Sequence, residues 1–349
     1  MQTLRLAVTC VGGNMIADVM AALRDASDYR IWILGLDFNV AAPGRVLCDA
    51  FTAVPSADID PDAWRAVMAD EIARHRLDGV VLLSDPETRA AGPLRNLPGV
   101  RFSCAANDVV ATVTDKLALL TRLKAAGMRT GPFCAVTADS LASLAHEMGY
   151  PARKLIVKAR NGRGSRGIYV IDPNVTGTQS NGVPGRDCLT GDLSSVAALI
   201  GSGSHYLTPY YDGPVYDVDC IANAGTVVDT AARLRQWANP FAPMSMGHRI
   251  EMDPEVLRYV ADAVRALGVD GAFDADVVIT EDGPVIMDAS CRLSGSTGIT
   301  WRAGKNFPAG LVRHMLGLPP VLTPIRDGAV FRTMMTQVEI DPSRQHIVF

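Results

Sequence analysis

The sequence predicts an α/β domain with a small parallel sheet, followed by an α+β half in which antiparallel hairpins carry the chemistry. Three observations support this. Apolar strands alternate with amphipathic helices over the first hundred residues. Strand pairs joined by tight turns replace that alternation after residue 150. At 349 residues the chain is also too long for one comfortable core, so two or three domains are expected.

The first part, expected over residues 1–113, has a βαβ rhythm. Gly12 and Gly13 form the turn between the first strand and the first helix, and the segment SDPE (84–87) follows the third strand. A dinucleotide-binding loop is the alternative for the VGGN turn, but the third glycine of that pattern is missing. A tight strand-to-helix turn is therefore favoured. The expected strands cover 4–9, 30–36 and 79–83, and the expected helices cover 16–24 and 64–76.

The second part, expected over 114–206, begins with a capped helix. Asp115 suits the N-cap of a helix over 116–126, and Gly127 ends it. A helix over 141–148 and a strand over 154–159 follow. Residues 173–192 are rich in Gly, Ser, Thr and Asn, so we expect a long exposed loop there, with or without a function.

The third part, expected over 207–325, has two antiparallel hairpins around a helix that Gly268 ends. A tail over 326–349 is expected to add one or two strands. The hairpin strands cover 215–222 and 226–234, then 273–279 and 284–289, and the helix covers 254–267.

A glycine-rich hairpin over 158–171 is the sharpest local signal. Gly162, Gly164 and Gly167 lie between β-branched strands, whereas a dinucleotide fingerprint opens a helix. Glycines at such a tip let backbone N–H groups approach phosphate oxygens, and Lys158 can add an ammonium. Arginines at 160, 163 and 166 add charge. An ordinary solvent-exposed hairpin is the alternative. A P-loop is excluded, because Asn306 follows Gly304-Lys305 where Ser or Thr is required.

An acidic hairpin over 273–289 is the second signal. A three-residue turn ending in Gly283 would place Asp276 directly opposite Asp288, where the carboxylates repel unless something positive lies between them. Mg²⁺ prefers carboxylate and phosphate oxygens. Ser290 is a further oxygen ligand at the strand end, and Arg292 can clamp an anionic substrate. Two edge-strand acids facing water are the alternative.

These motifs, in this order, resemble the ATP-grasp superfamily, most closely its carbamoyl-phosphate-synthase-like branch, over nearly the whole chain. The first part resembles the family's Rossmann-like pre-ATP-grasp domain. TDKLALLTRLKAAGMRTGP resembles its Asp-Lys helix, and KLIVKARNGRGSRGI its lysine strand and glycine-rich lid. VYDVDC resembles the strand that carries an acid, and IMDASCR stands where the family has Glu-x-Asn-Pro-Arg.

The resemblance implies a role for each matched residue. Lys116 and Lys158 would hold ATP phosphates, Mg²⁺ or alternatively Mn²⁺ would bind at the acidic hairpin, and Arg292 would act with Lys158 in catalysis. The other implied nucleotide contacts are Gly162, Gly164, Ser165, Arg166, Gly167, Thr208 and Asp219, and the implied metal ligands are Asp276, Asp288 and Ser290.

Several positions depart from the family pattern. Asp288 and Ser290 replace Glu and Asn, which shortens both ligands, and Cys291 replaces the proline. The ribose-binding acid falls near Thr208, where no carboxylate stands, and Asp212 is a weakly supported substitute. His248 lies near a substrate-side histidine of some relatives, although a lone histidine is more often structural.

The implied reaction joins a small carboxylate, an amino acid among the candidates, to an amine, with an acylphosphate intermediate and release of ADP and phosphate. A non-catalytic ATP-binding module and carbamoyl-phosphate-type phosphoryl transfer are the alternatives. Arg233 and Arg235 are candidate anion clamps, with Trp237 and Phe241 either as pocket walls or as core residues.

Bulk properties restrict the partners and the compartment. The formal charge of −4 gives no excess of positive charge that would attract a nucleic-acid backbone. No apolar run in the sequence is long enough to span a membrane. Seven scattered cysteines without a C-x-x-C pair indicate reduced thiols. A cytoplasmic protein that binds ATP and small substrates is expected, and a homodimer is left open.

Overall fold

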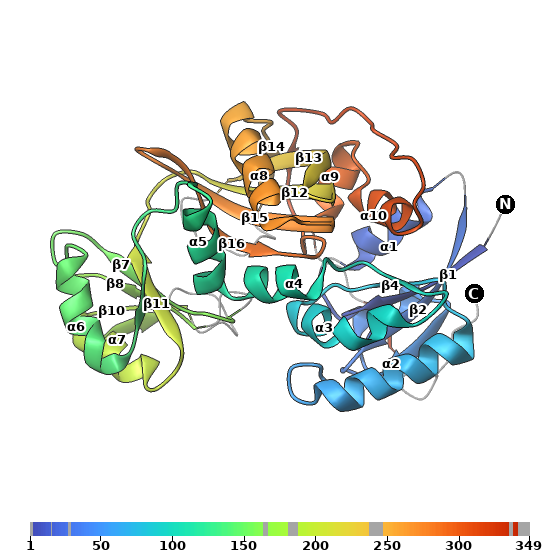
Figure 1. Cartoon of the computed structure of the whole chain (residues 1–349), viewed down its shortest axis with the longest axis horizontal. Coiled ribbons are helices and arrows are strands. Elements are labelled where there is room, and N and C mark those ends of the chain that lie inside the picture. The colour runs from blue at the N-terminus through green and yellow to red at the C-terminus, as the bar shows by residue number, and fades with distance from the viewer. Residues whose placement is uncertain are drawn as a thin grey trace.

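Three β-sheets organise the chain in the computed structural model (Figure 1). The structure describes residues 3–14, 16–26, 29–162, 167–180, 188–236, 247–334 and 338–340. No helix in these ranges is long and apolar enough to cross a membrane. All seven cysteines lie in them, and none of them forms a disulfide with another described residue.

The N-terminal sheet is parallel throughout, with strand order β3-β2-β1-β4-β5, which confirms the α/β prediction. Alternate side chains of β1 and β2 pack toward α1 on one face and toward α2 on the other. The elements are β1 (Thr3–Thr9), α1 (Ile16–Arg24), β2 (Arg30–Asp37), η1 (Pro43–Leu47), β3 (Ala50–Ala53), α2 (Pro61–His75), β4 (Gly79–Val81), α3 (Asp85–Ala90), η2 (Gly92–Asn96), β5 (Arg101–Phe102) and α4 (Asn107–Thr114).

The second sheet has six strands in the order β6-β11-β7-β8-β10-β9 and carries two helices on one face. Asp115 caps α5 (Lys116–Ala125), as predicted, by accepting hydrogen bonds from two backbone N–H groups. The other elements are β6 (Cys134–Val136), α6 (Ala138–Glu147), β7 (Leu155–Ala159), β8 (Ile168–Ile171), β9 (Thr178–Ser180), β10 (Cys188–Gly191), α7 (Leu193–Ile200) and β11 (His205–Pro209).

The expected long loop over 173–192 is wrong in part. β9 and β10 lie within it, and β10 extends the second sheet by pairing in parallel with β8. Cys188 of β10 is buried. Backbone pairing with a neighbouring strand has therefore overridden the polar composition of this segment.

The third sheet, in the order β16-β15-β12-β13-β14-β17, contains both predicted hairpins. Its apolar face packs on α8, which ends at Gly268 as predicted. The tail contributes one short strand, and residues 341–349 lie outside the described ranges. The elements are β12 (Val215–Asn223), β13 (Thr226–Arg235), β14 (His248–Ile250), α8 (Pro254–Leu267), β15 (Gly271–Thr280), β16 (Gly283–Ser290), α9 (Gly298–Ala303), α10 (Phe307–Met315) and β17 (Val330–Phe331).

The hydrophobic cores group these sheets into two bodies. The N-terminal domain and the third sheet share continuous cores, which include Trp64 of α2 with Val260 of α8, and Val8 of β1 with Leu311 of α10. The second sheet has its own core beneath α6 and α7. Figure 1 shows this second sheet as a lobe at one end of the molecule, with α5 between it and the rest.

Candidate functional site

Strand alternation divides the third sheet into an apolar face and a charged face. Tyr216, Val218 and Phe273 point into the core with α8. The residues between them in sequence therefore project to the opposite face. That face carries Asp217 and Asp219 on β12, Arg233 and Arg235 on β13, Asp274 and Asp276 on β15, and Asp288 and Ser290 on β16.

Asp276 and Asp288 are cross-strand partners, as the sequence predicts, but by another route. The turn has two residues, because Thr280 pairs with Gly283, and this register alone would put Asp276 opposite Met287. A β-bulge between Asp276 and Val277 shifts the register by one residue and restores the pair. The predicted three-residue turn is wrong, and the predicted pairing is correct.

Two cations already compensate this carboxylate pair. Lys116 Nζ lies 2.9 Å from Asp288 Oδ1, and an Arg235 nitrogen lies 2.8 Å from Asp276 Oδ2. The aspartate side chains are still 37% and 27% exposed, respectively. Two accessible carboxylates on adjoining strands fit Mg²⁺, which needs only one or two with substrate phosphate. Among the described residues no group of three or more His, Cys, Asp or Glu is placed to hold a metal.

Lys158 enters the site from β7 of the second sheet. Its neighbours Leu155 and Val157 point into the helix-covered core, whereas Ile156 and Lys158 point to the opposite face. Burial lowers the pKa of Lys158 to about 8, with the Asp288 charge opposing the shift. An anion bound beside Lys158 would stabilise its buried ammonium group.

The predicted lid follows β7, where Lys116 of α5 contacts the backbone of the hairpin. Lys116 Nζ donates to the Gly162 carbonyl at 2.6 Å, and Arg160 pairs with the helix cap Asp115. Lys158 pairs with Ile168 across the hairpin, which confirms the predicted strand–loop–strand form. The predicted lid residues Gly164, Ser165 and Arg166 lie outside the described ranges, as does Arg163.

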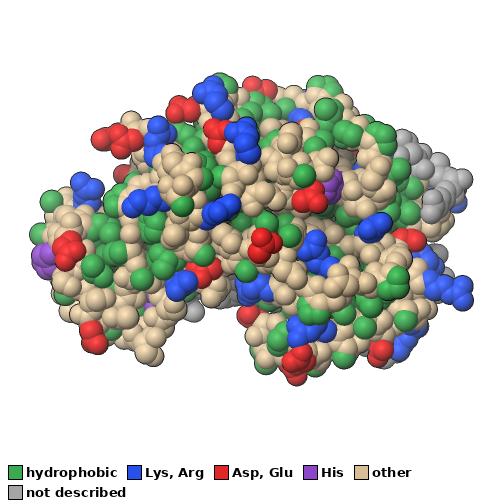
Figure 2. Space-filling view, viewed as in Figure 1, with side chains coloured by type: hydrophobic (Ala, Val, Ile, Leu, Met, Phe, Trp, Pro, Cys, Tyr) green, Lys and Arg blue, Asp and Glu red, His purple; other side chains and the backbone are tan. Residues whose placement is uncertain are grey.

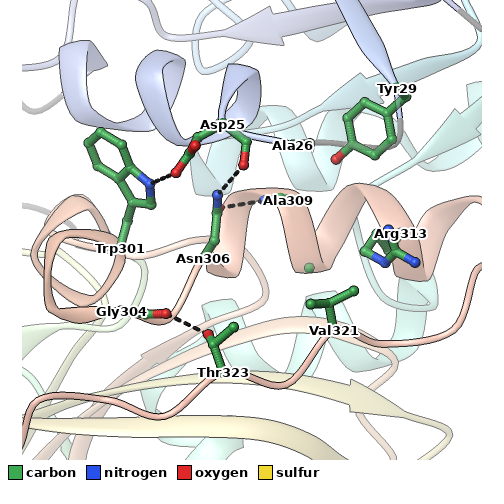
Figure 3. A pocket seen from close by; sticks show the side chains of 11 residues that line it. Asp25, Ala26, Tyr29, Trp301, Gly304, Asn306, Ala309, Arg313, Val321 and Thr323 are labelled. Atoms are coloured by element: carbon green, nitrogen blue, oxygen red, sulfur yellow. Dashed lines mark hydrogen bonds between the residues drawn. The ribbon is translucent and has the colours of Figure 1, made fainter. Parts of the chain in front are cut away.

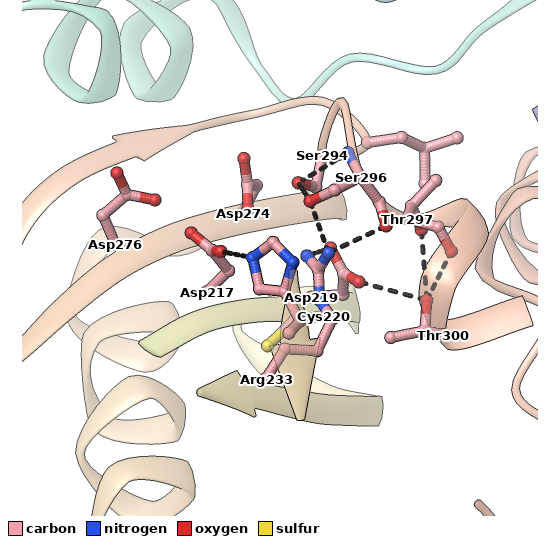
Figure 4. A network of polar contacts seen from close by, with 12 residues as sticks. Asp217, Asp219, Cys220, Arg233, Asp274, Asp276, Ser294, Ser296, Thr297 and Thr300 are labelled. Carbon is pink, nitrogen blue, oxygen red and sulfur yellow. Dashed lines mark hydrogen bonds and ion pairs between the residues drawn. The ribbon is translucent and has the colours of Figure 1, made fainter. Parts of the chain in front are cut away.

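A buried polar network lies beside Asp276 on the same face of the sheet (Figure 4). His248 Nε2 donates to Asp217 Oδ2 at 2.5 Å, and Arg235 Nε donates to Asp217 Oδ1 at 3.1 Å. Although burial opposes ionisation, the Arg235 charge and the His248 hydrogen bond hold the pKa of Asp217 well below its usual range. Burial lowers the pKa of His248, so this imidazole is neutral at pH 7.

Both arginines proposed as anion clamps are already paired with carboxylates. Arg233 is fully buried and donates to Asp219 Oδ1 at 3.0 Å and to the Ser296 carbonyl at 2.8 Å. Thr300 donates to Asp219 Oδ2 at 3.2 Å (Figure 4). Asp219, implied as a nucleotide contact, is thus engaged in a buried network, and the complete burial of Arg233 keeps its guanidinium from a substrate.

Arg292 lies between carboxylates from two domains. Its Nε is 3.3 Å from Asp85 Oδ1 at the start of α3, and its Nη1 is 3.4 Å from Asp274 Oδ2. Nη2 makes no hydrogen bond to the described residues. Burial raises the pKa of Asp274 well above its usual range, with the Arg292 charge opposing the shift. Asp85 and Asp217 were missed as site residues, although Asp217 has the same strand parity as Asp219.

Of the remaining predicted residues, Ser290 lies on this face. Ser290 is the cross-strand partner of Asp274, two residue pairs along the ladder from Asp276 and Asp288. Thr208 is the penultimate residue of β11 and donates its hydroxyl to the Pro132 carbonyl at 3.1 Å, so this hydroxyl is committed to the backbone. Trp237 and Phe241 lie outside the described ranges.

A cavity of about 460 Å³ opens elsewhere, between the end of α1, α10 and the segment 321–323 (Figure 3). Its polar groups are largely engaged, since Trp301 Nε1 donates to Asp25 at 2.8 Å and Asn306 donates to the Ala22 carbonyl at 2.8 Å. None of the residues that line it belongs to the charged face. Over the surface in Figure 2, acidic and basic side chains are interspersed and form no single-sign patch.

The chain has an ATP-grasp fold, which the neighbouring solved structures share, and one family model supports the resemblance to the ATP-grasp superfamily over part of the chain. The family model described as "ATP-grasp in the biosynthetic pathway with Ter operon" matches residues 204–337. No curated protein matches the sequence. The carbamoyl-phosphate-synthase-like branch stays a prediction.

Solved structures share this fold at low sequence identity. N5-carboxyaminoimidazole synthetase from Staphylococcus aureus, complexed with ADP, superposes with a TM-score of 0.70 at 16% identity, over 94% of this chain and 81% of that one. An L-amino acid ligase from Bacillus licheniformis gives 0.63 at 16% identity, over 91% and 75%. The biotin carboxylase domain of a Hydrogenobacter thermophilus 2-oxoglutarate carboxylase, with MgADP and bicarbonate, gives 0.68 at 15% identity, over 93% and 73%.

Proposed function

We propose that this protein is an ATP-dependent carboxylate–amine ligase. One observation carries the proposal. The accessible pair Asp276 and Asp288 faces the ammonium groups of Lys116 and Lys158, beside the base of a glycine-rich hairpin. Carboxylates beside ammonium groups and backbone donors are what a metal–polyphosphate complex requires. The names of the three neighbouring structures, an amino acid ligase, a synthetase and a carboxylase, support this reaction class.

Each element of the site has a role in holding ATP. A small apolar cluster lies on the same face of the second sheet as Lys158 and would contact the adenine ring of ATP. It consists of Ile156, Val170 and Cys188. Lys158 and Lys116 would hold the phosphates, and the hairpin over 162–167 would cover them. Asp276 and Asp288, with Ser290 beside them, would hold Mg²⁺, which neutralises charge on the transferring phosphoryl group when bound.

The proposed reaction consists of two successive nucleophilic displacements. A substrate carboxylate oxygen attacks the γ-phosphorus, the bond to the β-phosphate oxygen breaks, and ADP leaves. The amine nitrogen then attacks the acyl carbon, phosphate leaves, and the amine loses a proton to solvent as the amide forms. Arg292 Nη2, which makes no hydrogen bond to the described residues, would orient the acyl group, and the closed hairpin would exclude water from the acylphosphate.

The test is substrate-dependent ADP release. The protein with Mg²⁺ and ATP is given a panel of carboxylates paired with a panel of amines. We expect at least one pair to release ADP, and Asp288→Asn to lower kcat/KM by about 100-fold or more, because an oxyanion ligand of the metal is lost. Asp282→Asn, the same change at an exposed turn position of this hairpin, should keep wild-type activity.

Direct nucleotide binding separates this proposal from its alternative. A ligase binds ATP more tightly with Mg²⁺ than without, and the Asp288→Asn variant loses that difference. Magnesium-independent ATP binding together with no ADP release from any pair would instead support a non-catalytic nucleotide-binding module.

A further inference from the structure

A row of polar side chains crosses the charged face of the third sheet at one level. Asp288, Asp276 and Asp217 are successive cross-strand partners on β16, β15 and β12. Farther along the row, Arg235 of β13 is the cross-strand partner of His248 of β14. Carboxylates in direct succession repel one another unless a cation compensates them. The way in which Arg235 is held therefore decides how much negative charge remains at Asp276.

Arg235 reaches both neighbouring carboxylates from a diagonal position. It lies two residues beyond Arg233, the direct cross-strand partner of Asp217, and a diagonal neighbour is within reach of a long side chain. Arg235 Nε donates to the two oxygens of Asp217 at 3.1 and 3.2 Å. Its Nη2 lies 2.8 Å from Asp276 Oδ2. One guanidinium is thus shared between a fully buried carboxylate and a partly exposed one.

His248 holds the buried carboxylate of this trio. Its Nε2 donates to Asp217 Oδ2 at 2.5 Å, and neither side chain has any exposed surface. A fully buried imidazole does not touch a substrate or a metal, so its effect on the site has to pass through Asp217. Hydrogen bonds from His248 and Arg235 fix the rotation of the Asp217 carboxylate, and this in turn fixes the guanidinium beside Asp276. Partners of this kind orient the groups that bind a metal.

The negative charge of Asp217 decides what Arg235 leaves for a metal. In the trio of Asp217, Arg235 and Asp276, the guanidinium compensates one of two carboxylates. Asp217 faces its Nε in a buried environment, where an ion pair is screened less than at the surface. Asp276, with its side chain 27% exposed, then keeps negative charge that attracts Mg²⁺. Without Asp217, the whole guanidinium charge would face Asp276 and compete with the metal.

We propose that Asp217 and His248 are positioning residues of the metal site. Asp217 holds and neutralises Arg235, His248 fixes Asp217, and Asp276 is thereby left free to bind Mg²⁺. The inference rests on the metal site of the proposed ligase. It adds to that site two buried residues that act through others.

The test measures how much Mg²⁺ tightens the binding of a non-hydrolysable ATP analogue. Calorimetry gives the Mg²⁺ ratio, defined as the Kd without Mg²⁺ divided by the Kd with it, and requires no turnover. His248→Met removes the N–H donor, whereas His248→Gln keeps an N–H donor in a side chain of similar size. We expect the Mg²⁺ ratio to fall by about 5- to 10-fold in His248→Met and to stay within about twofold of wild type in His248→Gln.

A second pair of variants tests the charge of Asp217. Asp217→Asn keeps the size of the side chain and removes its charge, so the Mg²⁺ ratio should fall by about 10- to 100-fold. The double variant with Arg235→Met also lacks the competing cation, and its ratio should recover by about 10-fold over Asp217→Asn alone. A purely structural role predicts the opposite order, because the double variant removes more of the network. Arg249→Met, in an exposed ion pair on β14, should leave the ratio unchanged.

Binding of the analogue without Mg²⁺ reports on folding and should weaken by no more than about twofold in each variant. If one pair of variants loses this binding, the other pair decides. Loss in both pairs would make the network purely structural and overturn the proposal.

Three further results would overturn the positioning role while the ligase stands. They are an unchanged Mg²⁺ ratio in His248→Met and Asp217→Asn, equal losses in His248→Met and His248→Gln, and a lower ratio in the double variant than in Asp217→Asn. Failure of the proposed function gives a different result. If Mg²⁺ does not tighten binding to the wild type, the metal site itself is wrong, and the positioning role is wrong with it.

Discussion

Asp276 and Asp288 face each other across β15 and β16 only because a β-bulge corrects the register that the two-residue turn imposes. The turn alone would place a methionine opposite Asp276. Since β-bulges re-aim side chains next to functional sites, this one brings the two acids onto the charged face as a pair. Arg235 and Lys116 then compensate a repulsion that two bare carboxylates would create.

Lys158 should make stability depend on pH in a direction unusual for lysine. Its folded pKa of about 8 is below the unfolded value near 10.5, so the unfolded chain binds more protons between these values. Wild type should therefore gain about 2 kcal/mol relative to Lys158→Met between pH 7 and pH 9.5. Urea unfolding of both proteins at the two pH values measures this, and a constant difference would contradict it.

Bound ATP should raise the pKa of Lys158 again. Phosphate oxygens beside Lys158 favour its charged form, so nucleotide binding at pH 8.5 should take up protons. Calorimetry in buffers of different ionisation enthalpy reports the uptake, which should be smaller in Lys158→Met. Equal uptake in both proteins would place the titrating group elsewhere.

Arg235→Met should lower the free energy of unfolding by about 3–5 kcal/mol, because it leaves Asp217 buried without its guanidinium partner. The matched control is Arg249→Met on the adjoining strand, whose ion pair with Glu251 is exposed and worth no more than about 1 kcal/mol. Denaturant titration compares the two. Similar losses in both variants would mean that the buried network adds no stability.

Gly167→Ala should destabilise the hairpin more than Gly177→Ala. Both glycines have positive φ, +65° and +72°, so each alanine costs about 1–2 kcal/mol in backbone strain. At Gly167 the new Cβ would also meet the Ala159 Cβ at 2.9 Å, whereas at Gly177 nothing lies within 4 Å. We expect an additional loss of about 1 kcal/mol or more at Gly167, together with a raised KM for ATP.

The informative quantity is the difference in the free energy of unfolding between the two variants, because the backbone strain that both alanines cause cancels in it. If urea unfolding shows equal destabilisation of the two variants, and the KM for ATP is unchanged in both, the close contact between Gly167 and Ala159 of β7 is wrong.

Much of the architecture is readable in the sequence because its signals are local. Asp115 and Gly268 mark the two ends of helices through short-range capping, and both behave as predicted. The α/β start and the two hairpins follow from periodicity and turn residues. β10 could not be predicted, because its segment becomes a strand only by pairing with β8, and this pairing is not visible in the composition of the segment.

For the site, the sequence alone determined the residue types and their order: the lysine strand, the glycine-rich turn and the aspartates at alternating positions. Their roles depended on the tertiary structure. Arg233 and Arg235 could be read as anion clamps only until the fold paired them with Asp219 and Asp217. The unfilled oxygen of Asp274 likewise appears only once Arg292 and the N-terminal Asp85 are brought beside it. Charges interact through distance and burial, and neither is written in the order of the residues.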